Sequence, residues 1–251
     1  MLRSPKRGFA VPTMDQALSW MREFSVKHER TERQIPALEA QREKCGRKGA
    51  REWNGAIVAV GTGYGFVVQG AHDRFVITAA HCLPRLPSCN VGQHDGESLY
   101  PTLLGPPGGQ QTVAAACYFA EPVSDIAVLG LPGGIESPEE FRQFLQLTHA
   151  ATPLSIAEPP PASLGWIPSP DGDWLSYVIR SAWGRLLIIG LDEVHVEMSG
   201  VPIVSDQGMA FGVLCPDPER KLLRSSHPGL SGSLSGHWLR ILGVASASTA
   251  S

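Results

Sequence analysis

The sequence predicts a protein built mainly of β-strands, which follow a helical N-terminal extension. From Trp53 onward, short runs rich in β-branched and aromatic residues alternate with turns rich in glycine and proline, as is typical of an all-β fold. Residues 13–45 instead carry apolar residues at helical spacing. Apolar residues make up 43% of the 251 residues and charged residues 18%, so the chain can bury one or two cores and is too weakly charged to be disordered.

The N-terminal extension is predicted to be an amphipathic helix. Thr13 is a candidate N-cap, and Pro36 predicts a break after Ile35 because proline disfavours helical geometry in the residue before it. Two roles stay open for the apolar face, which can pack on the rest of the protein or dock onto a partner protein. The residues of this face are Ala17, Leu18, Met21 and Phe24.

The charge of the chain argues against nucleic acid as its main partner. The net charge is −3 and the pI is about 6.2, so the chain as a whole does not attract phosphates. Basic residues gather between Arg42 and Arg51, but Glu43 and two glycines interrupt them. This segment is predicted to be a solvated linker, with binding of an acidic partner as the alternative.

Two groups of runs predict the strands of the body. The first group comprises residues 56–60, 65–68, 75–78, 112–119 and 126–131, with a surface turn over 104–109 and a helix over 138–147. The second group comprises residues 174–181, 185–190, 201–204 and 210–215, with a hairpin turn over 205–208. The proline-rich segment 153–170 is predicted to cross the surface between the two groups.

Three motifs carry residue types suited to nucleophilic catalysis. His81 ends an apolar run in Thr-Ala-Ala-His-Cys, Asp125 directly precedes Ile-Ala-Val-Leu, and Ser199 lies in Met-Ser-Gly-Val-Pro. A serine hydroxyl needs a base within hydrogen-bond reach to attack a carbonyl at neutral pH. An imidazole, with an ordinary pKa of about 6.5, can act as this base. A carboxylate on its other ring nitrogen fixes the tautomer and stabilises the imidazolium.

In this order the motifs resemble those of trypsin-like serine peptidases, which have the chymotrypsin fold, and among them bacterial enzymes such as the glutamyl endopeptidases and the Deg-type peptidases. Gly63-Tyr64-Gly65-Phe66 also resembles a strand of this family, and the likeness covers residues 53–215. The resemblance implies two six-stranded antiparallel Greek-key barrels, at about 53–135 and 150–225, within a peptidase domain of residues 53–251. Residues 1–52 form the extension, and a short C-terminal helix is expected at about 234–245.

The resemblance also implies a serine endopeptidase that cleaves protein or peptide substrates through an acyl-enzyme on Ser199. In it His81 is the general base and Asp125 the orienting acid, and no metal or organic cofactor takes part. Ser231, in Gly-Leu-Ser-Gly-Ser, is the competing nucleophile. Ser199 is preferred because a strand, a hairpin turn and a second strand follow it. His195 is expected to be a strand residue near the substrate cleft.

The oxyanion hole departs from the family pattern. The resemblance assigns this hole to the backbone N–H groups of residues 197 and 199, and the family has glycine where this chain has Glu197. Loss of one oxyanion donor lowers the rate by about 10²–10³. The sequence leaves open a weak enzyme, an enzyme that depends on a partner, and an inactive pseudoprotease that acts as a protein-interaction module. Met198 stands where animal zymogens have an aspartate, so activation by a new N-terminus is not expected.

The five cysteines include no Cys-x-x-Cys pair. Buried free thiols are expected, with a short bridge between Cys82 and Cys89 as the alternative. Residues 1–10 are basic but lack the apolar core of a secretory signal, and no run reaches the roughly 18 apolar residues of a membrane helix. The sequence therefore predicts a cytoplasmic protein that does not insert into a membrane.

Overall fold

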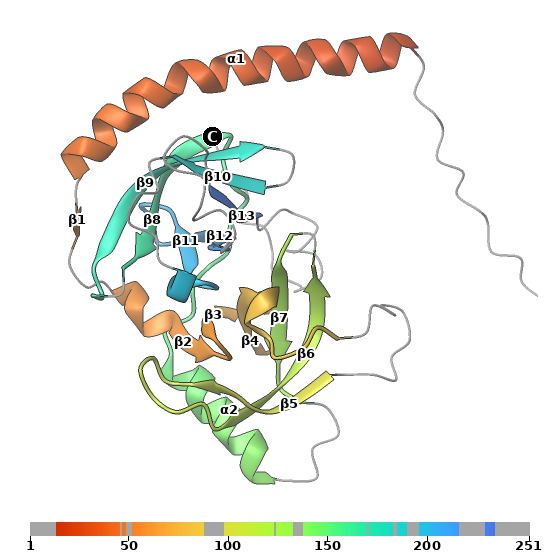
Figure 1. Ribbon diagram of the computed structural model, residues 1–251, viewed down its shortest axis with the longest axis vertical. Helices are drawn as coiled ribbons and strands as arrows, with labels where there is room; N and C mark the ends of the chain where they lie inside the picture. The colour runs from red at the N-terminus through yellow and green to blue at the C-terminus, as the bar shows by residue number, and fades with distance from the viewer. Residues whose placement is uncertain are drawn as a thin grey trace, which may run out of the picture.

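The computed structural model describes residues 14–45, 47–48, 52–87, 98–122, 124–132, 138–169, 171–182, 185–189, 196–215 and 229–233. Figure 1 shows two β units side by side. The long helix α1 (Met14–Cys45) lies across the second unit, and the short helix α2 (Pro138–Ala150) lies against the first. The predicted all-β body, the helical extension and the helix beginning at residue 138 are confirmed.

The first unit is a closed barrel of six antiparallel strands in the order β2-β3-β4-β7-β6-β5. All five runs predicted for this unit are strands. The prediction of a turn over 104–109 was wrong at its start, because residues 104 and 105 end β5 and the turn begins at Pro106. An internal proline, Pro101, conceals β5 in the sequence. The strands are β2 (Ile57–Val60), β3 (Gly63–Gln69), β4 (Arg74–Ala79), β5 (Ser98–Gly105), β6 (Val113–Glu121) and β7 (Ile126–Gly130).

The second unit is a seven-stranded sheet in the order β1-β9-β10-β13-β12-β11-β8, and the predicted second six-stranded barrel is not confirmed. β8 pairs with β9 from Ala162 opposite Arg180 to Pro168 opposite Trp174, and it meets β11 where Val204 lies opposite Trp166. The strands are β1 (Arg47–Lys48), β8 (Ala162–Pro168), β9 (Trp174–Ala182), β10 (Arg185–Ile189), β11 (Pro202–Val204), β12 (Ala210–Val213) and β13 (Gly229–Ser233).

The proline-rich connection does not cross the surface as predicted. Leu154 and Ile156 are buried, and both form isolated bridges, to Val68 of the barrel and to Ala210 of the second sheet. β8 then occupies residues 162–168. The prediction was wrong because the apolar side chains between the prolines match the apolar seam between the two units, where their burial is favourable.

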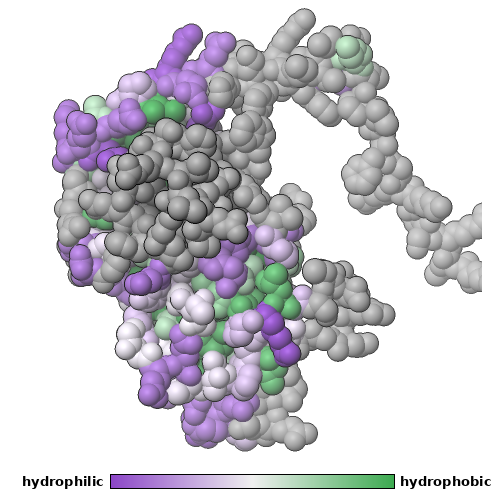
Figure 2. Space-filling model, in the orientation of Figure 1, coloured by the Kyte–Doolittle hydropathy of each residue, from purple (hydrophilic) through white to green (hydrophobic). Residues whose placement is uncertain are grey.

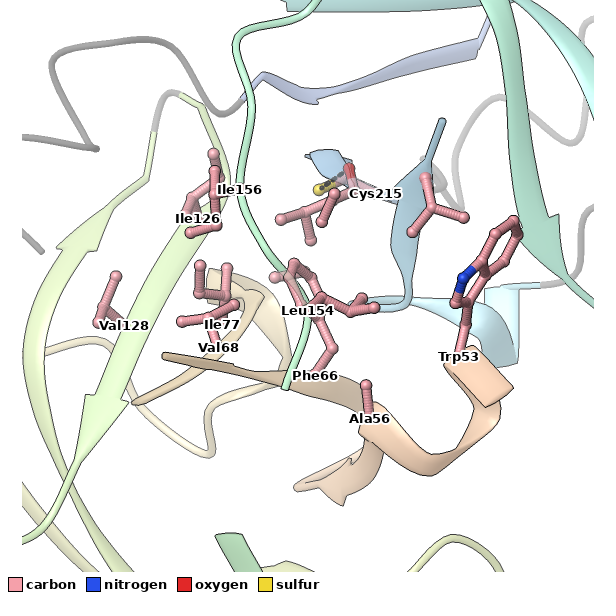
Figure 3. Close-up of a cluster of buried hydrophobic side chains, with 14 of the residues drawn as sticks. Trp53, Ala56, Phe66, Val68, Ile77, Ile126, Val128, Leu154, Ile156 and Cys215 are labelled. Atoms are coloured by element: carbon pink, nitrogen blue, oxygen red, sulfur yellow. Dashed lines mark hydrogen bonds between the residues drawn. The ribbon is translucent and has the colours of Figure 1, made fainter. Parts of the chain in front are cut away.

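The seam is filled by one apolar cluster that contains residues of both units. In Figure 3, Leu154 and Ile156 lie between barrel residues such as Ile126 and Ile77 and the second unit, in which Cys215 follows β12. Trp53, in the 3₁₀ helix η1 (Glu52–Ala56), packs edge-on against Trp174 at a centroid distance of 5.1 Å. A shared core of this kind fixes the two units relative to each other, because truncating such side chains leaves cavities that cost about 2–5 kcal/mol each.

Helix α1 is continuous through Pro36, so the predicted break after Ile35 was wrong. Pro36 is exposed, and water can satisfy the carbonyl that loses its partner where a proline lacks an N–H. Figure 2 shows hydrophilic side chains along the described end of this helix. The cap predicted at Thr13 and the side chains of Ala17, Leu18, Met21 and Phe24 lie outside the described residues, as do the predicted C-terminal helix, Cys89 and His195.

No helix among the described residues is long and apolar enough to cross a membrane.

Helix α2 has its C-terminal end held by Arg74, whose guanidinium donates to the carbonyls of Thr148 at 2.5 Å and Ala151 at 3.0 Å. Carbonyls at a helix C-terminus lack partners within the helix and carry the negative end of its dipole, so a cation there is stabilising.

Candidate active site

Neighbouring strands of the barrel carry His81 and Asp125. His81 lies in η2 (Ala80–Cys82), the 3₁₀ helix that follows β4, and Asp125 directly precedes β7. β4 and β7 pair antiparallel with Ala79 opposite Ile126. The end of one strand therefore meets the start of the other, which brings together two residues that are 44 positions apart.

One carboxylate binds both N–H groups of His81. Its Oδ2 lies 2.6 Å from the ring Nδ1, and its Oδ1 accepts a hydrogen bond from the backbone N–H of His81 at 2.9 Å. With a carboxylate on Nδ1, the proton of the neutral ring resides on that nitrogen, and Nε2 is left with a lone pair. The pair therefore presents a basic nitrogen in a fixed orientation.

The backbone of Asp125 is itself constrained. Its φ is 55°, in the left-handed region that few residues other than glycine adopt, although aspartate is among those that do. Its carbonyl accepts from the N–H of Ala80 at 3.1 Å, and the thiol of Cys215 lies 3.4 Å from the same oxygen. Backbone strain of this kind persists only where surrounding contacts hold it, and it occurs preferentially at functional sites.

The electrostatics of the pair favour a positive charge on the ring. The hydrogen bond with Asp125 raises the pKa of His81 from 6.5 to about 10. The neighbouring thiol of Cys82 contributes to the increase, and burial of the ring opposes it. The site therefore stabilises an imidazolium, the species that a histidine becomes when it removes a proton from a nucleophile.

Ser199 lies at the seam, on a loop that is hydrogen-bonded to both units. Its carbonyl accepts from the N–H of Tyr64 in β3 at 2.8 Å, and the N–H of Gly200 donates to the carbonyl of Leu214 at 2.8 Å. The N–H of Leu214 in turn donates to Val201 at 2.9 Å. Ser199 is only 3% exposed, so the loops around it shield most of the residue from solvent.

Two glycines allow this close approach. Gly200 has φ of +87°, and a Cβ at this position would lie 1.8 Å from the carbonyl oxygen of Tyr64. A Cβ on Gly63 would lie 2.6 Å from the carbonyl oxygen of Ser199, and 2.7 Å from the sulfur of Cys82, which follows His81. The Ser199 loop therefore packs against the segment that carries His81. The three predicted catalytic residues, His81, Asp125 and Ser199, therefore lie at the end of the barrel where β4 ends and β7 begins.

The remaining predicted residues lie as follows. Glu197 is exposed, within the 3₁₀ helix η3 (Val196–Met198) that leads to Ser199, and Met198 is buried. Ser231 lies in β13, where its backbone pairs with Leu186 of β10. Cys82 is a free thiol. Within the described ranges, no group of three or more His, Cys, Asp or Glu residues is arranged to hold a metal ion.

Sequence reasoning missed the roles of Tyr64 and Cys215. Tyr64 acts through its backbone N–H, which any residue other than proline provides, so its identity gives no signal. Cys215 is the last residue of the strand predicted over 210–215, whereas the observed β12 ends at Val213, and its contact with Asp125 spans 90 positions. A cysteine at the end of a predicted strand does not indicate a partner.

Comparisons with known proteins show distant likeness in fold. No protein-family model and no curated protein sequence matches the chain. Among solved structures, the serine protease of a human pathogenic astrovirus superposes with a TM-score of 0.44 at 13% identity, over 76% of this chain and 96% of that one. An inactivated protease paralogue of the scabies mite, S-D1, gives 0.48 at 15% identity, over 78% and 94%.

The serine protease domain of the Sesbania mosaic virus polyprotein gives a TM-score of 0.44 at 16% identity, over 71% of this chain and 88% of that one. These neighbours are proteins of the protease fold, and one of them is described as inactivated.

Proposed function

We propose that the chain is a serine endopeptidase in which Ser199 is the nucleophile, His81 the general base and Asp125 the orienting acid. The strongest support is the contact of one carboxylate with both the ring and the backbone N–H of His81. An ordinary turn aspartate before a strand is not expected to place both carboxylate oxygens on the N–H groups of one histidine. The proposal extends to the architecture of the resembled family, with the second sheet, in which β8 pairs with both β9 and β11, as the second barrel.

The proposed reaction follows from the arrangement. Nε2 of His81 removes the hydroxyl proton as Oγ of Ser199 attacks the peptide carbonyl carbon, and Asp125 stabilises the resulting imidazolium. The tetrahedral intermediate breaks its C–N bond, and the imidazolium donates its proton to the leaving amine. Water then hydrolyses the acyl-enzyme ester with His81 again acting as base. The second product is the carboxylic acid, and the serine hydroxyl is restored.

Labelling of the full chain with a serine-reactive fluorophosphonate tests this assignment. We expect one phosphonylated residue, identified as Ser199 by mass spectrometry, and no labelling of Ser199→Ala. Ser231→Ala is the matched control and should label like the wild type. Labelling that survives in Ser199→Ala and disappears in Ser231→Ala would move the nucleophile to β13.

A second candidate function is a pseudoprotease that serves as a protein-interaction module. The observation in its favour is η3, which includes Glu197 at the proposed oxyanion hole. The i→i+3 bonds of a 3₁₀ helix occupy the N–H groups at its C-terminal end and of the next residue, which here is Ser199, the second proposed donor, whereas an oxyanion hole needs its donors directed at the substrate. Absence of labelling in correctly folded wild-type protein would favour this second function.

A further inference from the structure

A pocket of about 180 Å³, partly open to solvent, lies beside the Ser199 loop. Its walls come from both units and from the segments that precede them. Ile57 of β2 and Tyr64 of β3 line one side, and the turn between β8 and β9 lines another. Met198 and Val201, which flank Ser199 and Gly200, complete it. This volume is smaller than the roughly 300–1,000 Å³ of sites for drug-sized ligands, so the pocket is suited to a single side chain.

The interior of this pocket is apolar, because polar groups in its wall are occupied or covered. The side-chain amide of Asn54 donates to the carbonyl of Gly172 at 3.1 Å and accepts a hydrogen bond from the indole N–H of Trp174. The hydroxyl oxygen of Ser169 is covered by protein atoms and has no hydrogen-bond partner among the described residues. Pro168, Met198 and Val201 are buried apolar residues of the lining. A ligand that enters far into the pocket therefore meets mainly carbon and sulfur.

The polar residues of the lining that are at least partly exposed lie at the mouth of the pocket, where it opens to solvent. Glu197 is exposed, and it lines the pocket two residues before Ser199. Tyr64 is half-buried and lines the pocket next to the N–H that binds Ser199. A peptide that inserts an apolar side chain can keep its backbone at this mouth, where the carboxylate and the phenol can bond to its N–H and C=O groups.

The position of the pocket beside the Ser199 loop indicates which part of a peptide would occupy it. Glu197 and Met198 precede Ser199 directly, and Val201 follows it after one glycine. Ser199 and His81 do not themselves line the pocket, so a side chain next to the scissile bond, and not the bond itself, would enter it when the carbonyl carbon of a peptide meets Oγ of Ser199. Burial of a large apolar side chain is favourable, and differences in apolar side-chain size discriminate between substrates by about 10–200-fold.

We propose that this pocket is a substrate subsite for one large apolar side chain, of leucine, methionine or phenylalanine size, close to the scissile bond. This inference rests on the proposed peptidase function. It makes Ile57 and Tyr64 residues that determine specificity. The subsite also links substrate binding to η3, because the bound side chain contacts the loop that includes Glu197.

Peptide binding tests the subsite without requiring catalysis. In the Ser199→Ala background, binding of fluorescent octapeptides is measured by anisotropy, with one position at a time held as Leu, Met, Phe, Ala, Asp or Lys. At one position we expect Leu, Met and Phe peptides to bind at least about tenfold more tightly than Ala, Asp or Lys peptides. Ile57→Trp fills the pocket and should abolish this difference. Leu99→Trp, at an exposed site on β5 outside the pocket, is the matched control and should preserve it.

A second variant and a second measurement separate the possible failures. Ile57→Ala enlarges the pocket and should shift the preference toward Phe and Trp, and circular dichroism verifies that both Ile57 variants fold. Fluorophosphonate labelling of the Leu99→Trp control with Ser199 intact should stay within about threefold of the wild type, because Leu99 is exposed and lies outside the pocket. No apolar preference in the Ser199→Ala protein, or the same preference in both Ile57 variants, would overturn the subsite. Absent labelling of the wild type would overturn only the peptidase function.

Discussion

The sulfur of Cys215 lies 3.4 Å from the carbonyl oxygen of Asp125. Cys215 belongs to the second unit and Asp125 to the barrel, and the residue before Cys215, Leu214, is hydrogen-bonded to Gly200 and Val201 of the nucleophile loop. One short segment after β12 therefore contacts both the acid and the loop that carries Ser199. The relative position of the two units thus sets the geometry of the candidate active site.

The first prediction concerns this segment. Cys215→Ser keeps a small side chain that can donate to the carbonyl of Asp125, and we expect its fluorophosphonate labelling rate to stay within about threefold of the wild type. Cys215→Val removes the donor and adds bulk at a buried position, which typically costs 1–3 kcal/mol. Its labelling should fall at least about tenfold. Equal labelling in the two variants would show that Cys215 does not position Asp125.

The second prediction concerns Gly200. A Cβ at this position would meet the carbonyl of Tyr64 at 1.8 Å, and its φ of +87° is strained for any residue with a side chain. We expect Gly200→Ala to abolish labelling and to lower the melting temperature. Gly208→Ala is an informative control, because it also has a positive φ but lies in the β11–β12 hairpin turn. It should lower stability while the labelling of the folded fraction persists.

The third prediction follows from the raised pKa of His81. The base must be neutral to accept the serine proton, and a pKa of about 10 keeps most of the ring protonated at pH 7. The labelling rate should therefore rise close to tenfold per pH unit between pH 7 and 9. Asp125→Asn removes the main cause of the shift, so the midpoint should fall toward about 6.5, while the maximal rate falls by up to about 10⁴. A wild-type labelling rate that is constant above pH 8 would contradict a general base, His81, with a pKa of about 10.

The pairing of His81 with Asp125 could be predicted from the sequence because each flanks an unbroken apolar strand, and adjacent strands bring such ends together. The positions of β5 and β8 could not be predicted from the sequence. β5 contains a proline and its end overlaps the turn predicted over 104–109, and β8 lies in the proline-rich segment that was predicted to cross the surface. Their strand geometry depends on pairing with distant partners, which overrides local propensity.

Packing also decided features that no local pattern encodes. Helix α1 continues through Pro36, which is exposed, and it lies against β8 and β9. The loop of Ser199 is held through backbone groups of Tyr64 and Leu214. Such contacts leave no mark on residue type, so the sequence indicated the catalytic residue types but not the interactions that hold them.

The fourth prediction concerns α1. Its C-terminal half contacts β9 through the ion pair of Glu32 with Arg180 and through Arg42, which lies 6.0 Å from the ring centre of Tyr177. Thr31 is buried on the same helix. Deletion of residues 1–45 exposes this surface and should lower the melting temperature by more than about 4 °C, where 1 kcal/mol corresponds to roughly 2–4 °C.

Glu32→Gln is the control for this deletion. It removes only a partly exposed ion pair, which contributes less than about 1 kcal/mol, so its melting temperature should change by less than that of the deletion. An unchanged melting temperature after the deletion would instead favour α1 as a helix that binds a partner protein.

The last prediction tests Glu197. Glycine at this position removes the carboxylate beside the developing oxyanion, and it lets the N–H of residue 197 turn toward the substrate carbonyl with little backbone strain. We expect Glu197→Gly to raise the hydrolysis of casein or of a peptide library, by up to about 10²–10³ if a donor is missing from the hole. The gain should appear in kcat more than in KM, because an oxyanion donor acts chiefly on the tetrahedral transition state. Glu197→Gln separates the two causes, since it removes the charge but keeps the backbone restriction, and it should recover only part of the gain. A wild type as fast as ordinary peptidases, with Glu197→Gly neutral or harmful, would show that η3 forms a working hole without glycine.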